Sequence, residues 1–587
     1  MADQRRYLPG LAAVMLLMGT GMVSGCSQPG TPDTTAEALP TEVTPQRDLS
    51  TLRMLYSRVP ATLNPHLATG VQDFEAGRIV FEPLATANER GELVPILAAE
   101  IPTVENGGIA ADGKSVTWQL QPDVQWSDGE PFTAEDVVFT FDFVSNPKVN
   151  AATAQYYEAV ESVEAIDEQT VKINFQDVTP AWQIPFTGQT GVILPQHIFA
   201  AANGPDARLA AANLQPIGTG PYQVDTPQPG SITFKPNPNY RGAAPYFAAI
   251  ELVGGLAPYA AAREVLGTGE ADFAHNLQVE VELLKDLQQD GKGVVDTVFG
   301  GLVERLMLNP TDPFAATESG ERSSLQAPHP FLSDVRVRQA IAYAIDRDAI
   351  TEELYGFTGR PTAQLLVAPR PYASPGTVAY EYDLEKAKAL LDEAGWSDSD
   401  GDGIRDRDGK NMEVVFQTSV NPVRQKTQTF IKDSLEELGI DVDIKRIRID
   451  DFFSGDPEQT NSINHFYADI QAYTTGNDHP DPTIYLSWWT CDQIATQANQ
   501  WQEPNNARYC NPEYDALLAA AKQELNPEKR AALFQEMDAL LSADVAVIPI
   551  VHRAIANGVA KDLTGLDPTP WDTSTWNIAD WQRQSVE

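Results

Sequence analysis

Residues 412–444, MEVVFQTSVNPVRQKTQTFIKDSLEELGIDVDI, combine three patterns in one stretch. Apolar and polar residues alternate at both ends, as in strands, and an apolar stripe at helical spacing lies between them, ending at Gly439. The residues that carry the patterns are Met412, Val414, Phe416, Phe430, Ile431, Leu435, Leu438, Ile440, Val442 and Ile444. A strand, helix and strand joined in this way predict two parallel neighbouring strands with a right-handed crossover. The C-terminal half is therefore expected to be α/β.

Segments on either side repeat these patterns. Ser333 is placed to cap a helix over residues 334–354, and Asp383 to open a second helix that Gly395 ends. Residues 513–542 add further helix. Alternation in the N-terminal half predicts half-exposed strands in a mixed sheet, and apolar residues near the C-terminus predict one more strand. These residues are Val116, Trp118, Leu120, Val171, Ile173 and Phe175, and then Val545, Val547, Ile548 and Ile550.

The chain of 587 residues is strongly acidic. It has 41 Lys and Arg against 82 Asp and Glu, a formal net charge of −41. Such a charge repels a phosphate backbone, so no nucleic-acid partner is expected. A solvated surface that keeps the protein in solution accounts for the acidity, and a field that attracts cationic ligands is the alternative.

The N-terminus carries the pattern of an export signal. Two arginines precede an apolar stretch over residues 8–23, which is shorter than a membrane-spanning helix needs, and no later stretch comes close to that length. The following Val-Ser-Gly-Cys resembles a bacterial lipoprotein signal, with residues 1–25 as signal peptide and Cys26 as the lipid-bearing first residue. An ordinary cleaved signal beside an incidental cysteine is the alternative. Residues 26–50, rich in Pro, Thr and acids, are expected to form a disordered tether.

Two further cysteines, Cys491 and Cys510, remain after the signal. A cysteine pair in an exported chain favours a disulfide. A metal pair is the alternative, but no C-x-x-C spacing and no neighbouring pair of histidines supports zinc.

Residues 108–115, GIAADGKS, satisfy the nucleotide-binding P-loop pattern letter for letter. A phosphate cradle requires a helix that starts at the lysine, so that its first amides face the anion. The alternation that begins at Val116 predicts a strand instead, and Asp112-Gly113 fits a hairpin turn. No nucleotide site is expected here.

Residues 398–409, DSDGDGIRDRDG, resemble a calcium-binding loop. Glycine stands at the sixth position, but the twelfth is Gly409, where a bidentate glutamate is expected. An acidic turn between a helix and a strand is the alternative, and the sequence does not decide between the two. The carboxylates concerned are Asp398, Asp400, Asp402 and Asp406.

No motif for catalysis or for a cofactor stands out. The chain has no GxSxG, HExxH or GxGxxG pattern, and its seven histidines are scattered. No cofactor and no catalytic metal are predicted, and the protein is not expected to be an enzyme.

Several segments, in order along the chain, are similar to signatures of one family. They are 126–139 (WSDGEPFTAEDVVF), 216–222 (PIGTGPY), 237–240 (NPNY), 331–347 (FLSDVRVRQAIAYAIDR) and 382–396 (YDLEKAKALLDEAGW). Together they resemble the bacterial extracellular solute-binding proteins of the peptide and nickel type, family 5. These are the capture subunits of ABC importers and include oligopeptide- and dipeptide-binding proteins. The resemblance covers nearly all of the chain after the tether.

The resemblance implies an α/β, two-lobed periplasmic-binding-protein-like fold of type II, in the large variant with an extra inserted domain, that closes by a hinge around its ligand. Domain II is expected at residues 91–209 and domain III, the second lobe, at 306–544. Domain I is expected in three pieces, residues 51–90, 210–305 and 545–587.

The same resemblance places the ligand at Gly476–Thr483. By register, Asp478 would present its carboxylate to the α-ammonium of a peptide, a strong contact where water is excluded. A helix or turn cap is the alternative role for Asp478, and Asp481 is expected to be structural. Three aromatic residues would line pockets for apolar parts of the ligand, although the core is the favoured place for at least one of them. They are Tyr485, Trp488 and Trp489.

The implied function is the capture of di- or oligopeptides and their delivery to the permease and ATPase subunits of an importer. The alternatives are the same role for a nickel chelate, an opine or an oligosaccharide, and, less favoured, a surface adhesin, a chaperone or a hydrolase. The protein is expected to be exported and monomeric, and held at a membrane by lipid on Cys26, facing the periplasm or the cell exterior.

Overall fold

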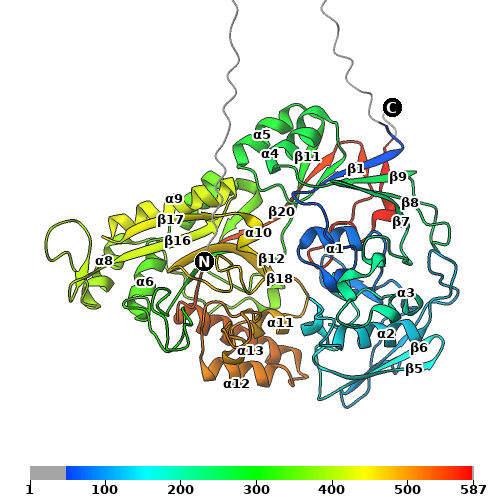
Figure 1. Ribbon diagram of the computed structural model, residues 1–587, viewed down its shortest axis with the longest axis horizontal. Helices are drawn as coiled ribbons and strands as arrows, with labels where there is room; N and C mark the ends of the chain where they lie inside the picture. The colour runs from blue at the N-terminus through cyan, green and yellow to red at the C-terminus, as the bar shows by residue number, and fades with distance from the viewer. Residues whose placement is uncertain (1–47, 585–587) are drawn as a thin grey trace, which may run out of the picture. The chain divides into compact units, whose positions relative to one another are not determined.

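The computed structural model describes residues 48–584 (Figure 1). The chain from Asp48 onward forms one compact unit. The predicted signal peptide, Cys26 and nearly all of the predicted tether lie outside the described residues. Between residues 48 and 584 we find no helix with the length and apolarity that a bilayer crossing needs.

A seven-stranded mixed sheet forms the body of the first lobe, in the order β11-β20-β10-β1-β9-β8-β7. β1 runs parallel to β9 and β10, while β20 is antiparallel to β10 and β11. Segments from the beginning, middle and end of the chain thus share one sheet (Figure 1). The strands are β1 (Thr51–Leu55), β7 (Tyr222–Gln228), β8 (Ser231–Pro236), β9 (Ala249–Val253), β10 (Phe273–Ala274), β11 (Gly293–Val298) and β20 (Ile555–Ala560).

A smaller sheet, in the order β4-β6-β5, extends the first lobe. Its alternating apolar residues are buried as predicted, but the sheet is antiparallel throughout, not mixed. A short hairpin joins β5 to β6, and β4 pairs antiparallel with the other edge of β6. Its core is continuous with that of the large sheet. The elements are β4 (Ser115–Gln119), β5 (Val160–Asp167), β6 (Thr170–Phe175), and nearby β2 (Ala85–Ala87), β3 (Leu93–Pro95), α1 (Val71–Gly77), α2 (Ala134–Ser145) and α3 (Gln196–Phe199).

The second lobe is built on a six-stranded sheet in the order β13-β19-β12-β18-β16-β17. The predicted strand-helix-strand unit is present: β16 and β17 pair in parallel, with Glu413 opposite Asp441, and α9 joins them. The elements are β12 (Gly301–Leu308), β13 (Gly359–Pro361), β16 (Glu413–Ser419), α9 (Pro422–Glu437), β17 (Asp441–Ile447), β18 (Ile470–Asn477) and β19 (Val547–Arg553).

Helices cover both faces of this sheet, with a separate apolar core on each face. Figure 1 shows α9 on one side of β16 and β17, and α11, α12 and α13 on the other side of β12 and β18. One face carries α6 (Val335–Tyr343), α7 (Arg347–Ile350), α8 (Leu384–Glu393) and α9; the other carries α10 (Ile449–Phe452), α11 (Thr483–Ser487), α12 (Pro512–Ala521) and α13 (Pro527–Ala543). The described part also includes α4 (Pro258–Ala262), α5 (Val281–Gln289), β14 (Asp406–Arg407), β15 (Lys410–Asn411), β21 (Leu563–Thr564) and β22 (Gln582–Arg583).

The helix predicted over residues 334–354 is wrong as a single helix. Asp334, not Ser333, caps it by accepting from the amide of Arg336, and α6 ends at Tyr343. Asp346 then starts α7 by accepting from the amide of Ala349. A second capping aspartate inside the apolar stripe therefore divides the helix.

Other local predictions hold. Asp383 caps α8 through the amide of Lys386, and Gly395 follows the helix with φ +83.

The last predicted strand is shifted, since β19 starts at Val547, and Val545 has a left-handed φ of 48 in the turn after α13.

The chain passes between the two large sheets after β11 and again after β19. β19 pairs with β12 of the second lobe, whereas the expected third piece of domain I starts at residue 545. We place the second crossing at Ala554, because β20 is the strand that returns to the first sheet. The other expected domain bounds stay predictions.

Candidate functional site

Asp478 lies directly after β18, at a contact between the two lobes. Its side chain is partly buried, and its Oδ2 accepts a hydrogen bond of 2.9 Å from the hydroxyl of Tyr156. Tyr156 belongs to the first lobe, in a short 3-10 turn over Ala154–Tyr157. The carboxylate predicted to meet a ligand is thus held at the place where the lobes meet.

Among residues 48–584, the carboxylate of Asp478 has no cationic partner. Burial raises its pKa, and the hydrogen bond from Tyr156 acts in the opposite direction. Within the described part of the chain, no lysine, arginine or histidine forms an ion pair with Asp478. A carboxylate withdrawn from water without a counter-charge is destabilised, so the position favours a cationic group.

The residues after Asp478 also touch the first lobe. The Nε2 atom of His479 lies 3.4 Å from the hydroxyl of Thr187, and burial lowers the pKa of His479 to about 4, so this histidine is neutral at physiological pH. Gly91, at φ +80, lies so close that a Cβ there would come within 3.3 Å of Pro480. The segment that follows β18 therefore docks on the first lobe.

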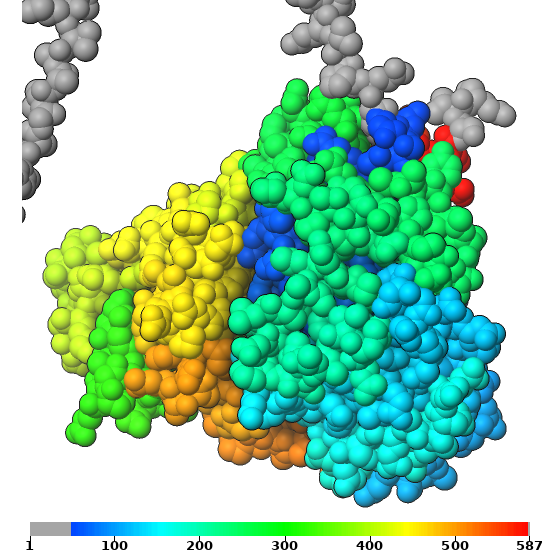
Figure 2. Space-filling model, turned by 45° about the vertical axis from the view of Figure 1, so that its right-hand side comes forward, coloured from blue at the N-terminus to red at the C-terminus, as the bar shows by residue number. Residues whose placement is uncertain are grey.

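A second contact between the lobes involves the predicted hairpin turn. A Cβ on Gly113 would lie 3.3 Å from a methyl group of Leu525, which follows α12. On the face shown in Figure 2, the orange surface of the second lobe abuts the cyan and teal surface of the first. The lobes are therefore in contact at more than one place.

Asp481 is structural, as predicted. It is 1% exposed and forms an ion pair with Arg530 of α13, whose Nη2 lies 3.1 Å from Oδ1. It also accepts from the amide of Thr483, the first residue of α11, at 3.0 Å. Although burial opposes it, the neighbouring guanidinium helps to hold the pKa of Asp481 below its usual value.

Two of the three predicted aromatic residues pack in the core of the second lobe. Tyr485 and Trp489 are each 2% exposed. Trp488 is partly exposed, and its buried indole N–H has no hydrogen-bond partner within residues 48–584. Of the three, only Trp488 has an exposed part, and its role at a ligand stays a prediction.

Two residues at this site were missed by the sequence reasoning. Tyr156 could not be found, because its partner Asp478 is 322 positions away. Arg305 of β12 is 1% exposed, donates to the hydroxyl of Tyr485 at 2.8 Å and stacks 5.5 Å from the ring centroid of Trp489. The sequence signal that could have indicated Arg305 is its place among the apolar residues of a predicted buried strand.

The predicted disulfide is present. Cys491 and Cys510 are bonded, with their Cα atoms 4.5 Å apart. The bond ties the turn after α11 to the start of α12.

The P-loop match is a hairpin, as predicted. The amide of Gly113 donates to the carbonyl of Ala110 at 2.9 Å, and that of Thr117 to Gly108 at 2.7 Å. β4 starts at Ser115, so a strand follows the lysine and no helical amides are available for a phosphate.

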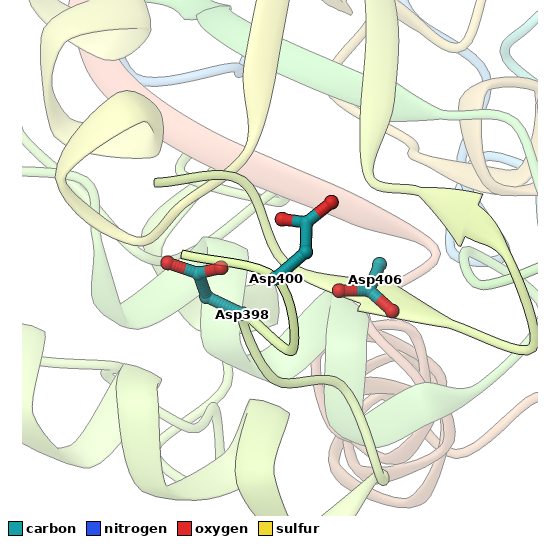
Figure 3. Close-up of side chains that lie close together, drawn as sticks. All are labelled: Asp398, Asp400 and Asp406. Carbon is teal, nitrogen blue, oxygen red and sulfur yellow. The ribbon is translucent and has the colours of Figure 1, made fainter. Parts of the chain in front are cut away.

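Three carboxylates of the acidic loop lie together (Figure 3). Asp398, Asp400 and Asp406 each place an oxygen within 4.8 Å of the others, whereas Asp402 is outside this group. Asp398 accepts from the amide of Gly401 at 2.6 Å, and Asp406 from that of Ser399 at 2.9 Å. Amides of the loop itself thus bind these carboxylates, as in the acidic-turn interpretation, and calcium binding stays a prediction.

Comparison with known proteins gives one consistent result. The family model for bacterial extracellular solute-binding proteins, family 5, middle part, matches residues 92–497. A Brucella ovis protein named as an ABC transporter peptide-binding protein is 29% identical over 484 residues, 81% of each chain. A Campylobacter jejuni structure in complex with Ni(L-His) has a TM-score of 0.76 at 23% identity, covering 91% of this chain and 100% of its own. A Bacillus subtilis oligopeptide-binding protein in complex with a nonapeptide has a TM-score of 0.73 at 20% identity, covering 91% and 99%.

Proposed function

Because this chain belongs to the bacterial extracellular solute-binding proteins, family 5, we propose that its solute is a di- or oligopeptide. The family and the relatives compared are solute-binding proteins of ABC importers and not enzymes, so the chain is the capture subunit of such an importer. The choice of a peptide as the solute goes beyond the family, and it rests on the side chains at the contact between the lobes.

Asp478 carries the proposal. It is a partly buried carboxylate, oriented by Tyr156 and lacking a cation among the described residues. The α-ammonium of a peptide supplies the missing charge and can donate to the oxygen that Tyr156 leaves free. Of the three predicted aromatic residues only Trp488 is partly exposed, so it is the one that can pack against an apolar part of the peptide.

Capture requires the lobes to separate and close. Two chain crossings, after β11 and after β19, join the large sheets, which is the connectivity of a hinge. We place the peptide between the lobes, where opening would break the Tyr156–Asp478 and Thr187–His479 contacts and closure would restore them. The solute would then pass to the permease and ATPase subunits.

Anchoring belongs to the same proposal. The family is extracellular, so the chain is exported. We propose further that lipid on Cys26 holds the monomeric protein at a membrane, with the residues before Asp48 as its tether. Mass spectrometry of the protein purified from membranes tests this, since an acylated N-terminal Cys26 is expected and an unmodified chain that starts at another residue contradicts it.

The test of the ligand uses paired peptides. Native mass spectrometry of the purified protein should reveal co-purified peptides, and added di- to pentapeptides should raise the melting temperature with concentration. The same peptides with an acetylated N-terminus should bind far more weakly, because the ammonium is lost. If no peptide co-purifies and no free peptide raises the melting temperature, the solute belongs to another class. Nickel chelates, opines and oligosaccharides are then tested next.

A further inference from the structure

An ion pair joins the two lobes away from Asp478. Nη1 of Arg58, in the segment that follows β1 of the first lobe, lies 3.1 Å from Oδ1 of Asp450, in α10 of the second lobe. The two residues are 392 positions apart, so only the fold brings them together. Figure 2 shows the blue surface of the first lobe beside the yellow surface of the second. The pair is a charged contact that exists only while the lobes touch.

Each partner also has a polar neighbour in its own lobe. Nη2 of Arg58 lies 3.5 Å from the side-chain oxygen of Gln72, in the first turn of α1. Oδ2 of Asp450 lies 3.8 Å from Nη2 of Arg448. When the lobes separate, both groups keep these neighbours and gain water, so neither becomes an unpaired buried charge. The contact can therefore break and form again at little cost.

The strands that lead into this contact lie away from the crossings between the lobes. In the second sheet β17, which precedes α10, is three places from the crossing strand β12, and in the first sheet β1 is two places from β20. At about 4.8 Å between neighbouring strands, these separations are about 14 Å and about 10 Å. A rotation about the crossings therefore moves the two partners apart.

The exposure of the pair sets the size of its effect. The side chain of Arg58 is 30% exposed and that of Asp450 is 57% exposed. Water and salt screen such a pair, which typically changes an equilibrium constant by about 1.5- to 5-fold. The pair cannot hold the lobes together alone, but it is strong enough to change the ratio of joined to separated lobes.

We propose that Arg58 and Asp450 form an electrostatic latch, which favours the joined lobes over the separated ones. The latch rests on the lobe closure in the proposed function. It acts before a solute arrives, and it is the same for a peptide and for any other solute.

The test measures the ratio of open to closed molecules without peptide. Single-molecule fluorescence energy transfer between dyes on Glu105→Cys of the first lobe and Asp433→Cys of the second reports the separation of the lobes, and both positions are exposed. In this labelled chain, Arg58→Gln and Asp450→Asn should each raise the open-to-closed ratio by about two- to fivefold. The double variant should raise it no further than a single variant, because both changes remove the same contact.

Arg448→Gln is the matched control. It removes a cation beside Asp450 that belongs to the same lobe, so it should not raise the ratio. Potassium chloride gives a test that needs only one variant. At 1 M salt, where the screening length is about 3 Å, the difference between the parent and Arg58→Gln should disappear. The difference is compared because salt also screens the repulsion between two lobes of a chain with a net charge of −41.

Two results would overturn the latch, and they are distinguishable. If open and closed molecules are both present but their ratio is the same in the parent, Arg58→Gln and Asp450→Asn, the ion pair does not act on closure, while closure itself stands. If every variant shows a single population at every salt concentration, the lobes do not separate, and the closure in the proposed function fails together with the latch.

Discussion

The hydroxyl of Tyr156 donates a hydrogen bond of 2.9 Å to Oδ2 of Asp478, although the two residues are 322 positions apart in the sequence. Each residue belongs to a different lobe, so the bond exists only while the lobes touch. The tyrosine holds one carboxylate oxygen, Oδ2, and so orients the group. An incoming ammonium would therefore meet an acceptor that is already positioned, which lowers the entropic cost of binding.

Asp478→Asn should weaken peptide binding by about 2 to 4 kcal/mol, with little loss of stability. The amide keeps the shape and can still accept from Tyr156, but it offers no charge to an ammonium. Isothermal titration calorimetry measures the affinity, and the exposed Glu458→Gln serves as control. An unchanged affinity together with a lower melting temperature would make Asp478 a structural cap.

Tyr156→Phe should move the pH dependence of peptide binding. The Tyr156 hydrogen bond lowers the pKa of Asp478, so its loss raises that pKa. On acidification, affinity should then decline at a higher pH in the variant than in the parent. Tyr157→Phe is the matched control, since the Tyr157 hydroxyl contacts the carbonyl of Thr190 and not Asp478. Superimposable pH profiles of the parent and Tyr156→Phe would argue against this coupling.

Asp481→Asn should destabilise the protein by about 3 to 5 kcal/mol, because it leaves the buried guanidinium of Arg530 without its counter-charge. Urea unfolding measures the loss. Asp478→Asn, three positions away, is the contrast, since it should change affinity and not stability. A loss below about 1 kcal/mol would mean that water or a neighbouring group replaces the pairing.

The buried carboxyl group of Glu75 should make the free energy of unfolding decrease as the pH rises. Burial raises its pKa to about 7 from an ordinary value of 4.5, so between these pH values the folded state holds the proton and the unfolded state releases it. Unfolding free energy should drop by on the order of 3 kcal/mol across this window. Glu75→Gln should remove that part of the slope in urea titrations, whereas the exposed Glu105→Gln should not. Identical slopes in the parent and Glu75→Gln would contradict the assignment.

Removing the Cys491–Cys510 bond should cost about 3 kcal/mol, as expected for a closed loop of 19 residues. The double variant Cys491→Ser with Cys510→Ser is compared with the parent by thermal unfolding. Thiol alkylation followed by mass spectrometry gives the direct measurement, and free thiols in native material would show that the bond is absent.

Local patterns predicted the local structure well. The unit β16-α9-β17 followed from residues 412–444, because strand and helix periods are read directly from neighbouring residues. The hairpin at Gly113 followed in the same way, although a motif search alone suggests a phosphate site there. The break between α6 and α7 was missed, since the apolar stripe continues through Asp346 and only the cap geometry shows that a new helix starts.

The site was only partly accessible to sequence. Resemblance indicated Asp478, but not Tyr156, because no pattern links residues that far apart in the chain. The residue type alone does not show whether an aromatic side chain lines a pocket or packs in the core. Tyr485 and Trp489 are buried in the core around Arg305.

The place of β20 in the first sheet has a consequence for biogenesis. β20 lies between β10 and β11, yet it is synthesised after every other strand of that sheet. The first lobe therefore cannot complete its sheet on the ribosome until residue 560 has emerged, and the nascent chain stays short of its native state until translation is nearly over.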